Sequence, residues 1–310
     1  MSTILVSGLI NIETTVKVDR FPVDYSPVRY PFWGVDSSVS GVGYNVAKAL
    51  TTLGDDVHLA SLVGGGLYAN VVREALRADG IPSDYVLHLL AQIPQSAILY
   101  DGTGRRQINV DLKDIQERAY PGDRFAEALQ RADLAVLCNI NFSRPHLSTA
   151  REVGIPIATD VHAISDLDDD YNRDFMEAAD ILFMSDEQLP TAPEEWARII
   201  MERYAPEILV IGQGAEGALL ALREGNVIEH VSAVPTRDVI STIGAGDALF
   251  AAFVHAYLRT RDPRLALRKA SVFASYKTGT AGAAEGFLTE TALDAWYQRV
   301  GKIAFDVHLS

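Results

Sequence analysis

Short apolar runs separated by helical patterns are the feature that most limits the fold of this 310-residue chain. The runs are rich in Val, Ile and Leu, and amphipathic patterns fill most of the intervals between them. Strands of a parallel sheet have this composition, because helices cover both faces of such a sheet. We therefore predict an α/β fold, with strands at Ile4–Ser7, Val57–Val63, Leu134–Cys138, Ile155–Thr159, Ile181–Met184 and Ile208–Ile211. The expected helices are Tyr44–Leu53, Ala69–Ala78, Phe125–Arg131, Pro145–Val153, Tyr171–Ala179 and Glu194–Tyr204.

Two stretches, residues 14–40 and 96–111, break this alternation. The first contains alternating apolar residues such as Val16 and Val18, and the second has the pattern of a hairpin around Asp101–Gly104. Neither fits a βα crossover, so we expect both to belong to a small separate sheet; the alternative is that they are surface loops. Beside a ligand cleft, such a sheet forms a lid, and its exposed apolar face favours a homodimer contact.

The C-terminal third begins with a further predicted hairpin, residues 217–232, which turns at Glu224–Asn226. Helical patterns dominate after it, and the chain shows no internal repeat or low-complexity linker. The simplest organisation is one domain over residues 1–310, with lid strands from about 14–40 and 96–111.

Composition narrows the class of partner. With 48% hydrophobic and 22% charged residues, the chain can bury a substantial core, and its net charge of −14 argues against binding to nucleic acid or an anionic membrane. The single cysteine, Cys138, cannot form a disulfide within the chain, which fits a reducing compartment. No signal-peptide pattern or long apolar segment is present, so we expect a cytoplasmic protein that binds a small molecule.

The run STIGAGD, Ser241–Asp247, stands directly before an apolar helical stretch. Gly244, Ala245 and Gly246 would open that helix, so free backbone amides and the positive end of the helix dipole converge on one anion-binding position. A carboxylate beside such a position is hard to explain by packing. We expect Asp247 to take a proton from a hydroxyl that then attacks the anion.

A second glycine-rich helix start lies at Ser40–Gly54, SGVGYNVAKALTTLG. Gly41 and Gly43 would let the backbone approach a ligand closely, and Asn45 offers both a donor and an acceptor. Taken alone, glycines before a helix also fit an ordinary turn with a cap. They indicate a ligand site because they occur together with the STIGAGD run, the predicted lid and the α/β pattern.

Together these features resemble the ribokinase-like (PfkB-type) family of sugar and nucleoside kinases over nearly the whole chain. The resemblance implies a three-layer α/β/α fold with a central, mostly parallel sheet and a small β-sheet lid, and a reaction that uses ATP and Mg²⁺. The family's C-terminal signature is Asp, Thr, any residue, Gly, Ala, Gly, Asp, and Thr242 and Gly244–Asp247 match it. The resemblance gives Asp247 the role of catalytic base and the amides of Gly244–Asp247 that of an anion hole. The chain has no Walker A or protein-kinase signature.

The resemblance also implies substrate contacts in the N-terminal half, at Asn11, Glu13, Gly41, Gly43, Asn45 and Asn141. Glu13 stands where relatives usually have Asp, and its extra methylene moves the carboxylate by more than roughly 1 Å. We therefore expect a shifted substrate; the alternative is that Glu13 points to solvent. Asn141 stands where ribokinase itself has a sugar-binding Glu, which argues against ribose.

For the nucleotide half, the resemblance implies a Gly-rich turn at IGQGAEG after a strand and an adenine-pocket wall at Ala274–Gly282, with a suggested monovalent-cation loop nearby. Small residues at helical spacing in the second stretch also fit close helix packing. The nucleotide contacts implied in this way are Thr242, Ser185, Gln213, Gly214, Gly217, Ala274, Lys277 and Gly282.

Several positions depart from the family pattern. Ser241 replaces the first Asp of the signature, and Ser40 replaces the first Gly of the N-terminal pair. Ser185 and Gln188 stand where relatives have an Asn and a Glu that help to hold the metal and phosphates through water. We expect Asp186 and Glu187 to supply carboxylates for Mg²⁺ instead, through water.

Asp160 and the pair Arg105 and Arg106 each allow two interpretations. Asp160 follows a predicted strand, where it could assist the phosphate site or cap the next turn. Arg105 and Arg106 on the predicted hairpin could reach a phosphate, although solvent exposure is the reading we favour. The histidines show no metal-ligand spacing, and we interpret them as structural or surface residues: His58, His88, His146 and His162.

The sequence thus favours an ATP-dependent kinase that phosphorylates a hydroxyl of a sugar or sugar-like compound. A nucleoside kinase is the nearest alternative, and a sugar-phosphate kinase is favoured if Arg105 or Arg106 points into the cleft. From another class, the substitutions at Ser241, Ser185 and Gln188 would also fit a sensor that binds a nucleotide or sugar without turnover.

Overall fold

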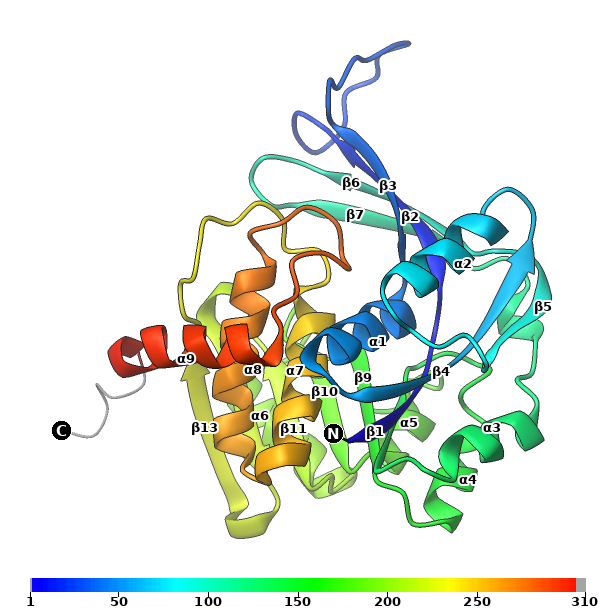
Figure 1. Cartoon of the computed structure of the whole chain (residues 1–310). Helices are drawn as coiled ribbons and strands as arrows, with labels where there is room; N and C mark the ends of the chain where they lie inside the picture. Colours follow the sequence, from blue (N-terminus) through cyan, green and yellow to red (C-terminus); the bar gives the residue numbers. More distant parts are fainter. Residues whose placement is uncertain (1, 305–310) are drawn as a thin grey trace.

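A large mixed sheet forms the centre of the computed structural model, which describes residues 2–304 (Figure 1). Within these residues, the sheet has nine strands, and every neighbouring pair is parallel except β11–β12 and β12–β13, which are antiparallel. In sheet order the strands are β13 (Val227–Ser232), β12 (Gly217–Leu222), β11 (Ile208–Gly212), β10 (Ile181–Ser185), β9 (Ile157–Ala163), β8 (Leu134–Leu137), β1 (Thr3–Ser7), β4 (Asp56–Gly65) and β5 (Val86–Gln92).

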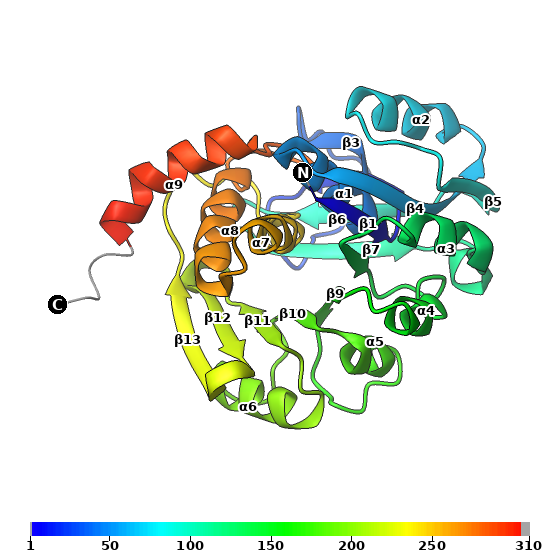
Figure 2. The same cartoon turned by 60° about the horizontal axis from the view of Figure 1, so that its bottom comes forward.

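Helices cover both faces of this sheet, because successive apolar side chains of each strand point to opposite faces. In β1, Ile4 and Val6 pack into one core cluster and Leu5 into the other. Figure 2 shows the two helical layers on either side of the sheet. The first layer contains α1 (Val42–Leu53), α2 (Ala69–Ala78), α7 (Ala245–Thr260), α8 (Pro263–Lys277) and α9 (Glu290–Ala304). The second contains α3 (Gly122–Leu129), α4 (His146–Glu152), α5 (Arg173–Ala178) and α6 (Pro193–Arg203).

A separate sheet of four strands lies over one end of the large sheet (Figure 1). Its order is β3 (Val35–Ser40), β2 (Asn11–Lys17), β6 (Gln95–Tyr100) and β7 (Arg106–Asp111), with β2 and β6 parallel and the other pairs antiparallel. The predicted three-layer α/β fold with a small second sheet is therefore confirmed. The hairpin over residues 217–232 is also present, and its turn is the short 3-10 helix Glu224–Asn226.

The strand β5 was not predicted from the sequence. It lies at the edge of the large sheet, where β4 is its one partner among the described residues, and most of its own residues are partly or fully exposed. An edge strand needs fewer apolar residues than a central strand, so its composition does not differ from that of a loop.

No helix among the described residues has both the length and the apolar character needed to cross a membrane.

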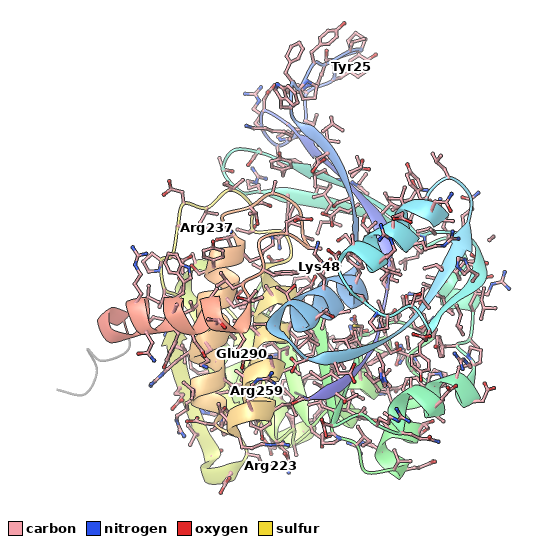
Figure 3. All side chains as sticks on the ribbon, viewed as in Figure 1. Tyr25, Lys48, Arg223, Arg237, Arg259 and Glu290 are labelled. Atoms are coloured by element: carbon pink, nitrogen blue, oxygen red, sulfur yellow. The ribbon has the colours of Figure 1, made fainter. Side chains whose placement is uncertain are left out.

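The helices α1 and α7 lie side by side and are joined near their C-terminal ends through Asp55, which follows α1. Asp55 accepts a 2.7 Å hydrogen bond from His255 and a 2.9 Å hydrogen bond from Arg259, both on α7. Arg259 also pairs with Glu290 at the start of α9, at 2.8 Å (Figure 3). These contacts fix the direction in which the N-terminal ends of α1 and α7 point.

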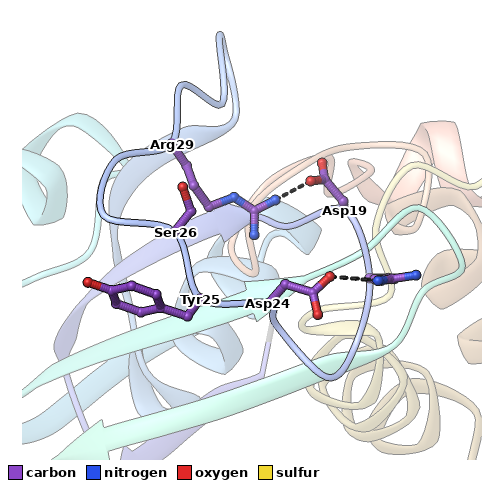
Figure 4. Close-up of a pocket in the computed structure, with 6 residues that line it drawn as sticks. Asp19, Asp24, Tyr25, Ser26 and Arg29 are labelled. Atoms are coloured by element: carbon purple, nitrogen blue, oxygen red, sulfur yellow. Dashed lines mark hydrogen bonds and ion pairs between the residues drawn. The ribbon is translucent and has the colours of Figure 1, made fainter.

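Residues 19–34, here named the arm, connect β2 to β3 and project beyond the small sheet (Figures 1 and 3). Ion pairs of Arg20 with Asp24 and of Arg29 with Asp19 lie beside a shallow hollow formed by arm residues (Figure 4). The arm carries a group of exposed apolar side chains, namely Tyr25, Val28, Tyr30, Phe32 and Trp33.

Candidate active site

Two glycine-capped helix N-termini form the frame of the site. The N-cap of α7 is Gly244 and that of α1 is Gly41, and no side chain caps either helix. The first-turn amides of α7, including those of Gly246 and Asp247, have no acceptor within the helix. A side chain placed on Gly246 would meet no atom within 4 Å, so open space lies in front of this helix start. These amides can therefore bind an anion.

Gly244 is required by its own backbone geometry. Its φ of 76° is unfavourable for other residues, and a Cβ atom there would lie 2.3 Å from the carbonyl oxygen of Ala283. The glycine lets the turn before α7 pack directly against the loop that follows α8.

A hydrogen bond joins the two helix starts. The side-chain amide of Asn45, on α1, donates to Asp247 Oδ2, on α7, at 2.7 Å. The hydroxyl of Ser40 lies 3.3 Å from Asn45 Oδ1 and 3.1 Å from Glu13 Oε2. The predicted base is thus connected through Asn45 and Ser40 to the carboxylate of Glu13 on the small sheet.

The environment of Asp247 favours its protonated form. Burial is the main cause, and the nearby charge of Asp160 acts in the same direction. The hydrogen bond from Asn45 and the charges of His162 and Lys277 oppose this effect, and the net result raises the pKa of Asp247 to about 6. A carboxylate with this pKa binds a proton more readily than an exposed aspartate and is still deprotonated at neutral pH.

Two acceptor atoms on β2 are buried and have no partner, namely Asn11 Oδ1 and Glu13 Oε1. The two residues are two positions apart on a strand, so their side chains point to the same face. Glu13 is only 5% exposed, which excludes the alternative that it points to solvent. A buried acceptor without a partner is costly, and hydroxyl groups of a ligand would satisfy both atoms.

Packing within the chain requires the two glycines at the start of α1. A Cβ atom on Gly41 would lie 2.5 Å from the carbonyl oxygen of Leu9, and one on Gly43 would lie 2.4 Å from the carbonyl carbon of Gly8. The close approach at both positions is to the chain's own β1–β2 connection. Their role in the structure is to seat α1 against the end of β1.

Asn141 uses its polar groups within the chain. Its side-chain amide donates to the carbonyl oxygen of Gln116 at 3.1 Å, and its backbone amide donates to Gln116 Oε1 at 3.2 Å. The structure therefore shows Asn141 holding the loop around Gln116.

In the predicted nucleotide half, Gln213 Oε1 is buried without a partner, directly after β11. Gly214 begins a short 3-10 helix, and Gly217 begins β12 with a φ of 116°. A Cβ atom on Gly217 would lie 2.1 Å from the carbonyl oxygen of Val231, so the hairpin itself requires this glycine. Gln213 is the residue of this turn whose geometry points to a ligand.

The stretch after β10 offers two carboxylates for a metal ion. Ser185 Oγ accepts a 3.3 Å hydrogen bond from the Glu187 amide, and burial raises the pKa of Asp186. No group of three or more His, Cys, Asp or Glu side chains that could hold a metal occurs among the described residues. Asp186 and Glu187 therefore fit an ion such as Mg²⁺ that takes most of its ligands from water and phosphates.

Arg106, on β7 of the small sheet, is exposed, as expected, but its guanidinium also contacts the loops that follow β10 and precede α7. Its guanidinium donates to Thr242 Oγ1 at 3.0 Å and to Glu187 Oε1 at 3.1 Å. Arg105 instead lies over the ring of Phe21, 5.6 Å from the ring centre. One arginine of the pair thus contacts the STIGAGD turn.

Lys277, expected in the wall of an adenine pocket, is fully buried, and its ammonium donates to the carbonyl oxygen of Ile243. Ser241 Oγ accepts a 3.3 Å hydrogen bond from the Ile243 amide and so braces the same turn. Ala274 lies on α8, partly buried, and Gly282 lies in the loop after it with a φ of 76°.

The sequence did not predict that His162 lies near Asp247. His162, interpreted as structural or surface, lies at the end of β9 with a φ of 58°, and its backbone amide donates to Asp160 Oδ1 at 2.8 Å. Its charge acts on Asp247. The usable signal was its position beside Asp160 at the carboxyl end of a parallel strand, where ligands bind in such sheets.

The chain is similar over most of its length to known proteins. The model of the pfkB family carbohydrate kinases matches residues 1–290. The chain is 26% identical over 291 residues to the ATP-dependent ribose-1-phosphate kinase of Halopiger xanaduensis, covering 91% of this chain and 94% of that protein. It is 29% identical over 263 residues to the 1-phosphofructokinase of Haloferax volcanii, covering 79% and 81%. A microbiome-derived acarbose kinase has a similar fold, with a TM-score of 0.85, 24% identity, and coverage of 96% of this chain and 99% of that chain.

Proposed function

The chain belongs to the pfkB family of carbohydrate kinases, and we propose that it transfers a phosphoryl group from ATP to a hydroxyl of a sugar or sugar-like compound, with Asp247 as the general base. The observation that carries this proposal is the 2.7 Å hydrogen bond from Asn45 to Asp247. It sets a carboxylate with a raised pKa between the substrate-side helix α1 and the anion-binding start of α7.

The proton transfer follows from the geometry of this carboxylate. Because Asn45 holds Oδ2, we assign the proton transfer to Asp247 Oδ1. Oδ1 accepts the proton of the substrate hydroxyl, the hydroxyl oxygen forms a bond to the terminal phosphorus of ATP, and the bond from that phosphorus to ADP breaks. The first-turn amides of α7 stabilise the negative charge on the transferred group.

The two buried oxygen atoms without hydrogen-bond partners would orient the substrate that receives the phosphoryl group. Asn11 Oδ1 and Glu13 Oε1 would receive hydrogen bonds from two hydroxyl groups of the substrate. A compound that lacks neighbouring hydroxyls would leave these atoms buried and unpaired, so a polyhydroxy compound fits the site best. Mg²⁺, held by the phosphates, water, Asp186 and Glu187, would neutralise phosphate charge when bound.

A sugar phosphate is a second candidate substrate, and the position of Arg106 favours it. The guanidinium reaches from the small sheet to Thr242, in the motif that we assign to the anion hole. Its side chain is about one-third exposed, so it can exchange this contact for a phosphate group. The two relatives described above are named for kinases of sugar 1-phosphates, which supports this candidate.

We also propose a homodimer in which the arm and the small sheet form the contact. In this proposal the small sheet acts as a lid over the site. Phe32 and Trp33 are almost fully exposed, and Ile108 and Val110 on β7 are half-exposed. Large apolar side chains gathered on one projecting segment favour contact with another protein surface. A second copy of the chain offers the same apolar segment in return.

Replacing the base provides the direct test of the proposed chemistry. Asp247→Asn keeps an acceptor for Asn45 but cannot take a proton, so kcat should fall by about 10²- to 10⁴-fold while ATP still binds. In the wild-type enzyme, kcat/KM should fall as the pH drops below about 6, because Asp247 becomes protonated there. The control Asp294→Asn removes an exposed carboxylate on α9 and should leave both values unchanged. Unchanged turnover in Asp247→Asn would rule out its role as base.

The two arginines of the hairpin distinguish the substrate classes. Arg106→Ala should raise KM for a sugar phosphate by about 10- to 100-fold, the range expected for lost hydrogen bonds to a charged group, and should change KM for the unphosphorylated sugar little. The matched control Arg105→Ala should have little effect on either value. An increase confined to KM for ATP would contradict the sugar-phosphate candidate.

The oligomeric state can be measured by sedimentation velocity. The wild-type chain should sediment as a dimer, and the double variant Phe32→Ser, Trp33→Ser should sediment as a monomer because the apolar contact is lost. The control Leu67→Ser changes an exposed leucine outside the arm and should leave the dimer intact. A monomeric wild-type protein would contradict the proposed dimer.

A further inference from the structure

A buried ammonium group lies directly behind the proposed anion hole. Lys277 is the last residue of α8, its side chain has no exposed surface, and its Nζ donates to the carbonyl oxygen of Ile243. Ile243 immediately precedes Gly244, the N-cap of α7. The proton-transfer steps described above make no use of this group.

Burial makes this ammonium costly unless nearby charges compensate it. Burial lowers the pKa of Lys277 to about 8, and the carboxylates of Asp247, Glu13 and Glu285 oppose the decrease, whereas Arg237 adds to it. The lysine therefore remains mostly charged at neutral pH. Its charge is close enough to act on both carboxylates of the candidate site, Asp247 and Glu13.

The ammonium lies where two loops meet. The backbone amides of Ile240 and Ser241 donate to the carbonyl oxygen of Thr278, at 2.8 and 3.0 Å. Gly244 packs against Ala283 in the same loop. The segment after α8 is therefore fixed against the turn before α7, and Lys277 contacts this turn from the side of α8.

The contact with Ile243 also sets the direction of a neighbouring donor. In a trans peptide, the carbonyl oxygen and the amide hydrogen point in opposite directions. Because the Ile243 carbonyl points toward Lys277, the amide of Gly244 points away from it, out of the α8 side of the turn. A fixed cation thus orients a backbone amide at the start of the anion-binding helix.

We propose that Lys277 is a positioning residue that supplies a built-in cation to the phosphoryl-transfer site, so that the chain needs no bound monovalent cation in this loop. The proposal rests on the proposed kinase function, and it replaces the monovalent-cation loop suggested by the sequence. A tethered ammonium holds the Ile243–Gly244 peptide and adds positive charge near the transferred phosphoryl group. A free cation at the same place would have to be bound from solution.

The first test compares salts in the wild-type enzyme. We expect kcat to be the same in KCl and in tetramethylammonium chloride at equal ionic strength, because tetramethylammonium is too large to replace a small bound cation. Stimulation of the wild-type enzyme several-fold by K⁺ would overturn the proposal. This comparison needs no variant, so it does not depend on whether a substituted chain folds.

Two substitutions then separate charge from packing. Lys277→Met keeps most of the volume and removes the charge, and kcat should fall by about 10- to 100-fold, with KM for ATP changed less. Lys277→Ala leaves space for a small cation, so ammonium or K⁺ should restore part of the lost kcat, by about 10-fold. The control Lys269→Ala, on the same helix, removes only a surface ion pair with Asp294 and should match the wild type in every salt. A folded Lys277→Met chain with wild-type kcat would overturn the proposal.

Melting temperature provides a readout that does not require activity. Ammonium should raise the melting temperature of Lys277→Ala relative to tetramethylammonium, because it binds the folded state, and should leave that of the wild type unchanged. A Lys277→Ala chain that responds to ammonium in neither kcat nor melting temperature would overturn the cation role. If the wild type phosphorylates no compound in any salt, the kinase proposal fails, whereas the melting data still test Lys277.

Discussion

The hydrogen bond between Asn45 and Asp247 is the interaction on which the candidate site depends. It joins the N-terminal ends of α1 and α7, while Asp55 joins the same two helices near their other ends. Two contacts so far apart prevent either helix from rotating against the other. In the proposed kinase, these contacts would hold the substrate side and the anion-binding side in one geometry before a ligand binds, and such preorganisation would lower the barrier to phosphoryl transfer.

The same region concentrates buried charge at a cost to stability. Burial raises the pKa of Glu13, and the nearby charge of Asp247 raises it further. Lys277 compensates part of this negative charge from behind the turn. The balance leaves Asp247 with a pKa of about 6, which would suit the general base of the proposed reaction.

The sequence predicted the elements whose signal is local. Central strands such as β1 and β11 are apolar on both faces, and the helix start at Gly244 has a distinctive composition, so both were found without a structure. The edge strand β5 was missed because half-exposed strands lack that signal. The contacts of Arg106 and Lys277 could not be predicted either, because each joins segments distant in the chain. Likewise, the sequence identified Gly41 and Gly43 as special positions, but it could not predict that they pack against Leu9 and Gly8.

A double-mutant cycle of Asn45→Ala and Asp247→Asn tests the central claim most directly. The quantity to measure is kcat/KM for phosphorylation of the substrate hydroxyl by ATP. If Asn45 acts by holding the base, the loss from Asn45→Ala should be large in the wild-type background and small once Asp247 cannot accept a proton. The two losses would then be far from additive. Additive losses would show that Asn45 and Asp247 act independently and would contradict the account of a single site joined by their hydrogen bond.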